Sequence, residues 1–321
     1  MNVLVVTANA DAPFLTQQVD ALEARGVAVR ILPIAGEVGA DVDRSPLDYV
    51  RTVPRVLREA GPEYDLVHAH YGLTAPAALA QLRLPVVLSL WGSDVYGPAA
   101  PVSKLCAPLC AETVVMSDAM RTELGRGTVI PDGVDLERFR PESRARARED
   151  VGWSADEYHV LFPYSPARTV KNYPRAERVV AAASRRLDRP VRLQTVSGVD
   201  HDAVSTYLNA ADALLLTSDS EGSPNSVKEA LACNVPVVSV PVGDVPERLG
   251  GVDPSVVART DRALVAGLVD VLERGERSNG REAAREVSIE RTADRMLAVY
   301  ERATGTRVAD REREREAVAS R

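Results

Sequence analysis

Short apolar runs rich in Val, Ile and Leu, separated by longer amphipathic segments, are the feature that most constrains the fold of this chain. In the first part of the sequence these runs occupy residues 3–6, 27–32, 66–67, 86–90, 113–116 and 129–130. A run that is apolar at every position is typical of a strand buried on both faces of a parallel sheet. Helical patterns such as residues 17–25 and 76–82 lie between the runs. Residues 1–140 therefore predict one doubly wound α/β domain.

The same alternation restarts after an interruption at residues 131–141 and an Arg- and Ala-rich stretch at 143–150. Further strands are predicted at 160–162, 191–196, 213–216, 235–240 and 256–258, and helices at 174–187, 224–232 and 261–273. A chain of 321 residues is long enough for two domains that each bury a core. Residues 141–285 thus predict a second doubly wound α/β domain.

The last periodic segment, within residues 286–304, places Ile289, Met296, Leu297 and Tyr300 near one stripe. We expect a helix here that docks on the rest of the protein. Residues 305–321 alternate acids and arginines with little to bury, which predicts a charged tail.

Charge and composition exclude several classes of partner. A formal net charge of −7 argues against a nucleic-acid partner, because such proteins carry concentrated basic surfaces. The three cysteines form neither a disulfide framework nor a zinc site, and no apolar run has the length of a signal sequence or a membrane span. We expect a cytoplasmic protein that binds no metal. The oligomeric state stays open.

The segment from Glu221 to Glu229 has the features of an anion site. Ser223 and Pro224 predict a helix start with Ser223 as the cap, and Asn234 predicts its left-handed end. A loop between a strand and a helix N-terminus favours a diphosphate, because free amides and the helix dipole attract an anion. The two flanking carboxylates would repel a phosphate, so hydroxyl groups of a sugar and a ribose are their expected partners.

The spacing Glu221-x7-Glu229, with its inserted Pro224-Asn225 and the downstream strand at 236–238, resembles the donor block of the retaining glycosyltransferase family four. The resemblance implies the GT-B fold, in which two Rossmann-like domains face each other across a cleft. It implies that Glu221 holds hydroxyls of the transferred sugar and that Glu229 holds the ribose. The donor-binding residues between them would be Gly222, Ser223, Pro224, Asn225 and Ser226.

Other segments extend the resemblance over most of the chain. Arg168 and Lys171 resemble the cationic pair that neutralises the leaving diphosphate, although Pro166 occupies the family's usual Arg position. Residues 130–139 resemble the interdomain hinge, and the segment ending at Tyr300 resembles the helix that crosses back to the first domain.

Two segments of the first domain are candidates for acceptor binding. His68-Ala69-His70-Tyr71-Gly72 follows a predicted strand and opens a helix, so His70 and Tyr71 would lie at the carboxyl edge of the sheet. His70 is also a candidate catalytic residue beside Glu221, Lys171 and Arg168, although a structural histidine is the alternative. Trp91 and Asp94 follow the next strand, and Trp91 stands where the family often has His. Trp91 would form a wall for a sugar ring or part of the core.

Two departures from the family concern specificity. Residues 9–13 replace the family's Gly-Gly turn. Between Val191 and Ala210 the second domain lacks one strand-helix unit of the family, in the stretch where relatives carry a glycine-rich loop near the nucleobase.

The resemblance implies transfer of a sugar from a nucleotide diphosphate sugar, with UDP-sugar the favoured donor, to a hydroxyl acceptor. The product would be a glycoconjugate, polysaccharide or glycosylated metabolite, and no cofactor beyond this co-substrate is expected. Two alternatives remain: a GT-B nucleotide-sugar epimerase or hydrolase, and a non-catalytic nucleotide-sugar-binding subunit. Arg51, Arg55 and Arg58 lie at helical spacing and could face an anionic membrane or a lipid-linked acceptor, or only solvent.

Overall fold

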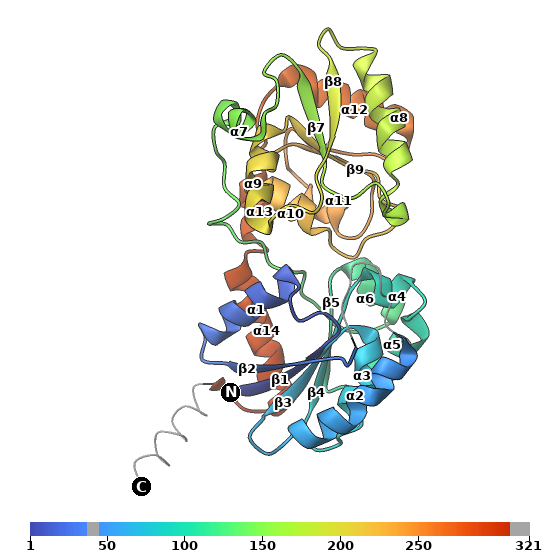
Figure 1. The fold of residues 1–321 in the computed structure, drawn as a ribbon, viewed down its shortest axis with the longest axis vertical. Coiled ribbons are helices and arrows are strands. Elements are labelled where there is room, and N and C mark those ends of the chain that lie inside the picture. The colour runs from blue at the N-terminus through green and yellow to red at the C-terminus, as the bar shows by residue number, and fades with distance from the viewer. Residues whose placement is uncertain (37–44, 309–321) are drawn as a thin grey trace. The chain divides into compact units, whose positions relative to one another are not determined.

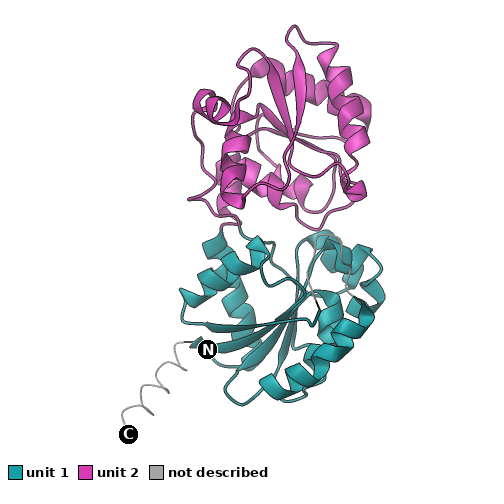
Figure 2. Cartoon of the chain, in the orientation of Figure 1, with its two compact units in different colours: residues 1–133, 289–321 teal, residues 134–288 magenta. Residues whose placement is uncertain are grey.

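The computed structural model describes residues 1–36 and 45–308. The chain divides into two compact units (Figure 2), unit 1 with residues 1–133 and 289–321 and unit 2 with residues 134–288. The predicted tail, residues 305–321, falls mostly outside the described residues. Within the described residues, no helix combines the length and the apolar character that crossing a membrane requires.

Unit 1 contains a six-stranded parallel sheet in the order β2-β1-β3-β4-β5-β6 (Figure 1). Its strands are β1 Asn2–Thr7, β2 Ala28–Pro33, β3 Leu66–His70, β4 Val86–Leu90, β5 Glu112–Val115 and β6 Thr128–Val129. Every residue of β3 and β4 is buried, including His68 and His70 of β3 and Ser89 of β4. The strands form the centre of one continuous apolar core.

Helices and 3-10 turns connect these strands. They are α1 Pro13–Glu23, α2 Pro46–Glu59, η1 Gly72–Thr74, α3 Ala75–Leu79, α4 Gly92–Tyr96, α5 Ala100–Cys106, η2 Ala107–Leu109 and α6 Asp118–Leu124. The last element of unit 1, α14 Ile289–Thr304, comes from the far end of the chain and packs against α1. Met296 and Tyr300 of α14 belong to the core of unit 1.

A buried polar cluster fixes α14 against the sheet of unit 1. His68 of β3 contacts the Tyr300 hydroxyl through Nδ1 at 2.7 Å and the Ser89 hydroxyl through Nε2 at 2.8 Å. Burial lowers the pKa of His68 well below its usual value, so its ring is neutral. A neutral imidazole offers one donor and one acceptor, which two hydroxyl groups can match.

Unit 2 contains a five-stranded parallel sheet in the order β11-β10-β9-β7-β8. Its strands are β7 Tyr158–Phe162, β8 Val191–Thr195, β9 Ala213–Leu216, β10 Val237–Ser239 and β11 Val256–Val257. Its helices are α7 Arg144–Val151, η3 Thr169–Lys171, α8 Tyr173–Ser184, α9 His201–Ala210, α10 Asn225–Ala232, α11 Val245–Arg248, α12 Asp261–Arg274 and α13 Gly280–Arg285.

The central strand β9 shows why a fully apolar run belongs in such a sheet. Leu214 and Leu216 join the apolar core on one face, whereas Ala213 and Leu215 join the core on the other face. Successive side chains of a strand point to opposite faces, so both faces of β9 need apolar residues. The expectation of two doubly wound α/β units is confirmed, and the predicted elements differ from the observed ones mainly at their ends.

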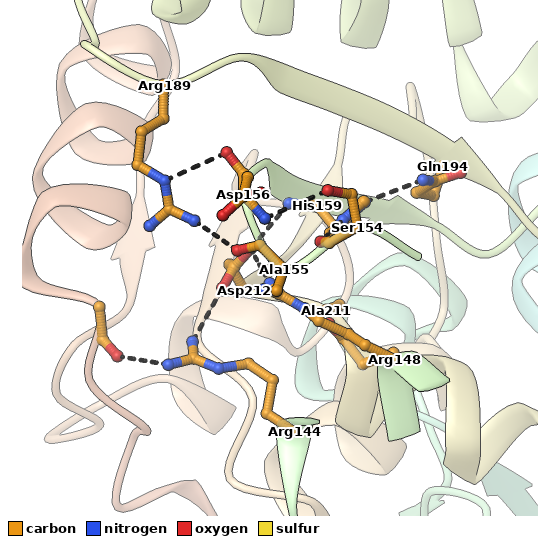
Figure 3. Close-up of polar contacts among 12 residues, drawn as sticks. Arg144, Arg148, Ser154, Ala155, Asp156, His159, Arg189, Gln194, Ala211 and Asp212 are labelled. Atoms are coloured by element: carbon orange, nitrogen blue, oxygen red, sulfur yellow. Dashed lines mark hydrogen bonds and ion pairs between the residues drawn. The ribbon is translucent and has the colours of Figure 1, made fainter. Parts of the chain in front are cut away.

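The Arg- and Ala-rich stretch that separates the two series of strands forms α7, which is tied to the rest of unit 2 by ion pairs (Figure 3). Asp212, which directly precedes β9, accepts from Arg144 at 2.8 Å and from Arg148 at 2.6 Å. The backbone amide of His159 in β7 also donates to Asp212, at 2.7 Å. Arg148 and Asp212 are both buried. The cluster therefore lies at the amino ends of β7 and β9.

We expect Asp212→Asn to lower the free energy of unfolding of unit 2 by about 3–5 kcal/mol, because it leaves the buried Arg148 cation without its anion. Glu282→Gln is the matched control, since Glu282 is 79% exposed in its ion pair with Arg285, and such a pair contributes little. Urea unfolding of the two variants and the wild type measures the difference. Equal losses in both variants would contradict the importance of the buried cluster.

Candidate functional site

The order of strands in unit 2 reverses at β7, because β8 lies on one side of it and β9 on the other. Ligands of doubly wound sheets bind at the carboxyl ends of the strands where the order reverses. The loops after β7 and β9 meet at this point, as the Asp219 amide donates to the Val170 carbonyl at 2.9 Å. The topology thus joins two segments that are far apart in sequence.

An ion pair connects the predicted catalytic residues of these two loops. The Lys171 ammonium lies 2.5 Å from Glu221 Oε1, and the Ser218 hydroxyl donates to the same oxygen at 2.6 Å. The side chains of Lys171 and Glu221 are only 6% and 13% exposed. Burial lowers the pKa of Lys171 below its usual value, and the adjacent Glu221 charge opposes this shift only in part. Lys171 and Glu221, which were predicted separately as catalytic residues, therefore lie in contact in the structure.

Tyr164, two residues after the end of β7, forms a wall beside this pair. Its ring centroid lies 3.9 Å from the Lys171 ammonium, a cation–π contact, and its hydroxyl contacts the Ser226 hydroxyl. Burial, followed by the charge of Glu221, raises the pKa of Tyr164. Arg168 is exposed, and its guanidinium lies 5.9 Å from the same ring. Arg168 thus lies at the rim, and the desolvated cation of this loop is Lys171.

The start of α10 differs from the expected capping. We predicted Ser223 as the cap, but the helix begins at Asn225 with Pro224 in the cap position and no side-chain cap. The Ser223 hydroxyl donates instead to Asp244 at 2.9 Å. The cap prediction was wrong because a tertiary partner competes for the hydroxyl. The predicted left-handed end is confirmed, with φ +55° at Asn234.

A second ion cluster supports the loop from behind. Lys228 of α10 is 1% exposed and donates to the Ser223 hydroxyl at 3.1 Å. Burial raises the pKa of Asp244 above its usual value, although the charges of Lys228 and Arg248 oppose this shift. Gly243 has φ +55°, and a Cβ there would lie 2.5 Å from the Gly222 carbonyl oxygen, so the two loops approach too closely for a side chain.

The predicted ribose ligand Glu229 lies one helical turn after Ser226. Its side chain is 14% exposed, and its Oε1 lies 3.2 Å from Nε2 of His201 at the start of α9. Ser226 is buried and contacts Tyr164. On another face of α10, Val227, Ala230 and Leu231 are fully buried in the unit 2 core.

The geometry combines a cation and a helix N-terminus with two carboxylates. Lys171 and the amides at the start of α10 favour an anionic group. Glu221 and Glu229 favour hydrogen-bond donors such as hydroxyl groups. Among residues 1–36 and 45–308, no group of three His, Cys, Asp or Glu side chains could hold a metal ion. The contacts to a donor that were predicted for Gly222, Ser223, Pro224, Asn225, Ser226 and Arg168 stay predictions.

In unit 1, the two histidines lie within β3 and not after it as predicted. His70 is 2% exposed, its Nε2 lies 3.1 Å from His68 Nδ1, and burial lowers its pKa to about 3. The His70 ring is therefore neutral and lies 5.7 Å from that of Trp91. Trp91 is half-buried and packs edge-on against Phe14 at 4.9 Å. Trp91 is thus at least part of the packing, and an acceptor role for His70 and Trp91 stays a prediction.

Asp94 connects two loops at the carboxyl edge of the unit 1 sheet. Its carboxylate accepts from the amide of Gly72 at 3.0 Å and from the amide of Trp91 at 2.8 Å. Burial raises the pKa of Asp94 to about 7, although both hydrogen bonds lower it. Tyr71, between these loops, has φ +89°. Asp94 thus fixes the backbone around Tyr71, and direct acceptor contacts of Asp94 and Tyr71 stay predictions.

Sequence reasoning missed Tyr164, Ser218 and His201 on the front of the site, and Lys228 and Asp244 behind it. The position of Lys228 inside the segment from Glu221 to Glu229 was the available sequence signal for this residue. Tyr164, His201 and Asp244 come from other elements and had no local signal.

The chain was compared with known families and proteins. Residues 1–138 match the family described as Glycosyltransferase Family 4, and residues 171–274 match Glycosyl transferases group 1. A D-inositol 3-phosphate glycosyltransferase of Mycobacterium tuberculosis (strain H37Rv) is 30% identical over 96% of this chain and 75% of its own length.

Solved structures share the fold at lower identity. Sucrose-phosphate synthase from Thermosynechococcus elongatus has a TM-score of 0.75 and 18% identity, over 94% of this chain and 98% of its own. The Anabaena protein HepE, solved with UDP and glucose, has a TM-score of 0.62 and 15% identity, over 100% of this chain and 99% of its own.

Asp94 predicts a pH dependence of stability. Because its folded pKa of about 7 exceeds the unfolded value of 3.8, the folded state binds the proton more tightly. This contribution is fully present below pH 3.8 and is lost as the pH rises through 7, by roughly 4 kcal/mol in total. Asp94→Asn lacks the titrating group. Urea unfolding between pH 4.5 and about 8 should show the wild-type stability falling relative to the variant, and parallel curves would refute the assignment.

Proposed function

We propose that this chain, which belongs to glycosyltransferase family 4 and has the GT-B fold, is a retaining, metal-independent transferase whose donor is a UDP-sugar. The family membership establishes a glycosyltransferase that uses a nucleotide sugar. The stereochemistry, the independence from metal and the nucleobase go beyond it. The acceptor is a hydroxyl group of a glycoconjugate, a polysaccharide or a metabolite.

The observation that carries the proposal is the buried Lys171–Glu221 pair beside the start of α10. In the proposed complex, Lys171 and the α10 amides bind the diphosphate, while Glu221 accepts hydrogen bonds from sugar hydroxyls and Glu229 from the ribose. Lys171 then stabilises the negative charge that grows on the leaving phosphate oxygen. A desolvated ammonium acts strongly there, and this supports the proposal that no metal ion is needed.

We propose front-face substitution for the chemical step. The bond between the anomeric carbon and the diphosphate oxygen breaks, and the acceptor oxygen bonds to the same face of that carbon. The acceptor proton passes to the departing phosphate oxygen. Neither Glu221 nor Glu229 needs to act as a nucleophile, because both are engaged with hydroxyl groups in this arrangement.

UDP is supported as the donor nucleotide by the Anabaena HepE complexes, which hold UDP, UDP with glucose, or UDP-glucose. The mycobacterial relatives are named for D-inositol 3-phosphate, which makes this compound a reasonable first acceptor to test. A nucleotide-sugar epimerase or hydrolase would need no acceptor, and a non-catalytic subunit would show no turnover.

We expect the wild-type protein to release UDP from UDP-glucose or UDP-N-acetylglucosamine only when an acceptor such as D-inositol 3-phosphate is present, equally with and without EDTA. Lys171→Met should lower kcat about 10²- to 10³-fold, because it removes charge stabilisation from the transition state. Lys104→Met, at a surface ion pair in unit 1, is the control and should retain activity. Coupled UDP release gives the rates, and proton NMR of the product gives the anomeric configuration.

Rapid turnover without any acceptor would instead favour a hydrolase or epimerase. Inversion at the anomeric carbon would contradict the retaining mechanism, and loss of activity in EDTA would contradict metal independence. If UDP, GDP and ADP all fail to raise the melting temperature, the proposed donor site itself is refuted.

We also propose that α2 contacts an anionic membrane surface. Arg51 and Arg58 are exposed on one side of the helix, and Leu47 and Val50 next to them are 61% and 64% exposed. A stripe of cations beside exposed apolar residues is typical of helices that lie in the membrane interface.

Changing Arg51, Arg55 and Arg58 to Glu should abolish flotation with phosphatidylserine vesicles, because each cation contributes about 1 kcal/mol near such a surface. The control changes Arg178, Arg185 and Arg186 of unit 2 to Glu, which alters net charge equally. Similar flotation of both variants would show that α2 is only a solvated face.

A further inference from the structure

We propose that His201 is a positioning residue for Glu229 and thereby determines how strongly the protein prefers a ribonucleotide over a nucleotide without ribose hydroxyls. The inference rests on the proposed function, in which Glu229 accepts hydrogen bonds from the ribose. Glu229 alone does not fix the direction of its carboxylate, because a glutamate side chain has several accessible rotamers.

His201 is placed to restrict Glu229 from one side. It is the first residue of α9, and its Nε2 lies 3.2 Å from Glu229 Oε1. The two side chains are 28% and 14% exposed, so solvent competes only partly for this contact. The bond uses Oε1 and leaves Oε2 as the oxygen that can meet a ligand.

Arg138 fixes which ring nitrogen of His201 carries the hydrogen. Arg138 Nη1 lies 2.9 Å from His201 Nδ1. A guanidinium can only donate hydrogen bonds, so Nδ1 must accept from it. In the neutral ring the hydrogen then resides on Nε2, which donates to Glu229. The direction of both hydrogen bonds follows from the fixed donor character of Arg138.

Three further contacts hold the hydrogen-bonded series Arg138–His201–Glu229 in place. The His201 ring packs edge-on against Phe139, with 5.5 Å between ring centroids. Arg138 is oriented by Asp202 at 3.2 Å and more weakly by Asp135 at 3.9 Å. Arg138 and Phe139 belong to the segment before α7 that was predicted as a hinge. The orientation of the Glu229 carboxylate thus depends on residues of the segment before α7 as well as on α10.

The test compares the affinity for UDP with that for 2′,3′-dideoxy-UDP, measured by isothermal titration calorimetry. We expect the wild type to bind UDP about tenfold or more tightly, because hydrogen bonds to a charged acceptor are strong. His201→Phe keeps the aromatic packing against Phe139 but removes the donor. This variant should bind UDP several-fold more weakly, a loss typical of one hydrogen bond. Its affinity for 2′,3′-dideoxy-UDP should be unchanged.

His201→Gln is the rescue variant, since its amide can donate near the position of Nε2, and it should restore most of the preference for UDP. Glu229→Gln is the positive control for loss of ribose discrimination. The dideoxy affinity reports whether each variant retains a folded site, because this ligand makes the same base and diphosphate contacts.

The outcomes separate this inference from the proposed function. If the wild type binds both ligands equally, the ribose role of Glu229 fails, and the positioning role of His201 fails with it. If the wild type discriminates and His201→Phe discriminates equally well, only the His201 inference is overturned. Equal weakening of both ligands in His201→Phe would also overturn it, because a general structural defect would explain the loss.

Discussion

The strands of a parallel sheet all run in one direction, so their carboxyl ends lie at the same edge of the sheet. The candidate site depends on this constraint. In unit 2 the order of strands reverses at β7, so the loops after β7 and β9 lie side by side. The Lys171–Glu221 pair joins these loops at 2.5 Å. Without this edge, a lysine and a glutamate from separate loops would have no reason to meet.

The two ends of the unit 2 sheet carry different kinds of ionic interaction. At the amino ends, Asp212 is saturated by Arg144, Arg148 and a backbone amide, so its charge is fully used in binding α7. At the carboxyl ends, Lys171 and Glu221 form a pair next to the start of α10. The Asp212 cluster therefore serves the packing of α7, whereas the Lys171–Glu221 pair lies at the edge where doubly wound sheets bind ligands.

The sequence predicted the features that depend on local pattern. The strands, the helix from the Glu221 block and the left-handed Asn234 follow from apolar periodicity and turn chemistry. The family resemblance assigned Lys171 and Glu221 to one donor site, but their ion pair was not predicted, because no rule of spacing relates residues in separate loops. Ser223 was misjudged because Asp244, from the loop after β10, takes its hydroxyl. His201 could not be recognised, since its significance depends on how α9 packs beside α10.

The helix α14 has a consequence for the synthesis of the protein. Unit 1 begins with the first strand of the chain, yet its core includes Met296 and Tyr300, which follow all of unit 2. A ribosome therefore presents every residue of unit 2 before unit 1 can bury His68 against Tyr300. Unit 1 can therefore complete its core only after unit 2 has been synthesised, which reverses the usual N-terminal-first order of cotranslational folding. During that interval the apolar surface that α14 will cover is open to chaperones.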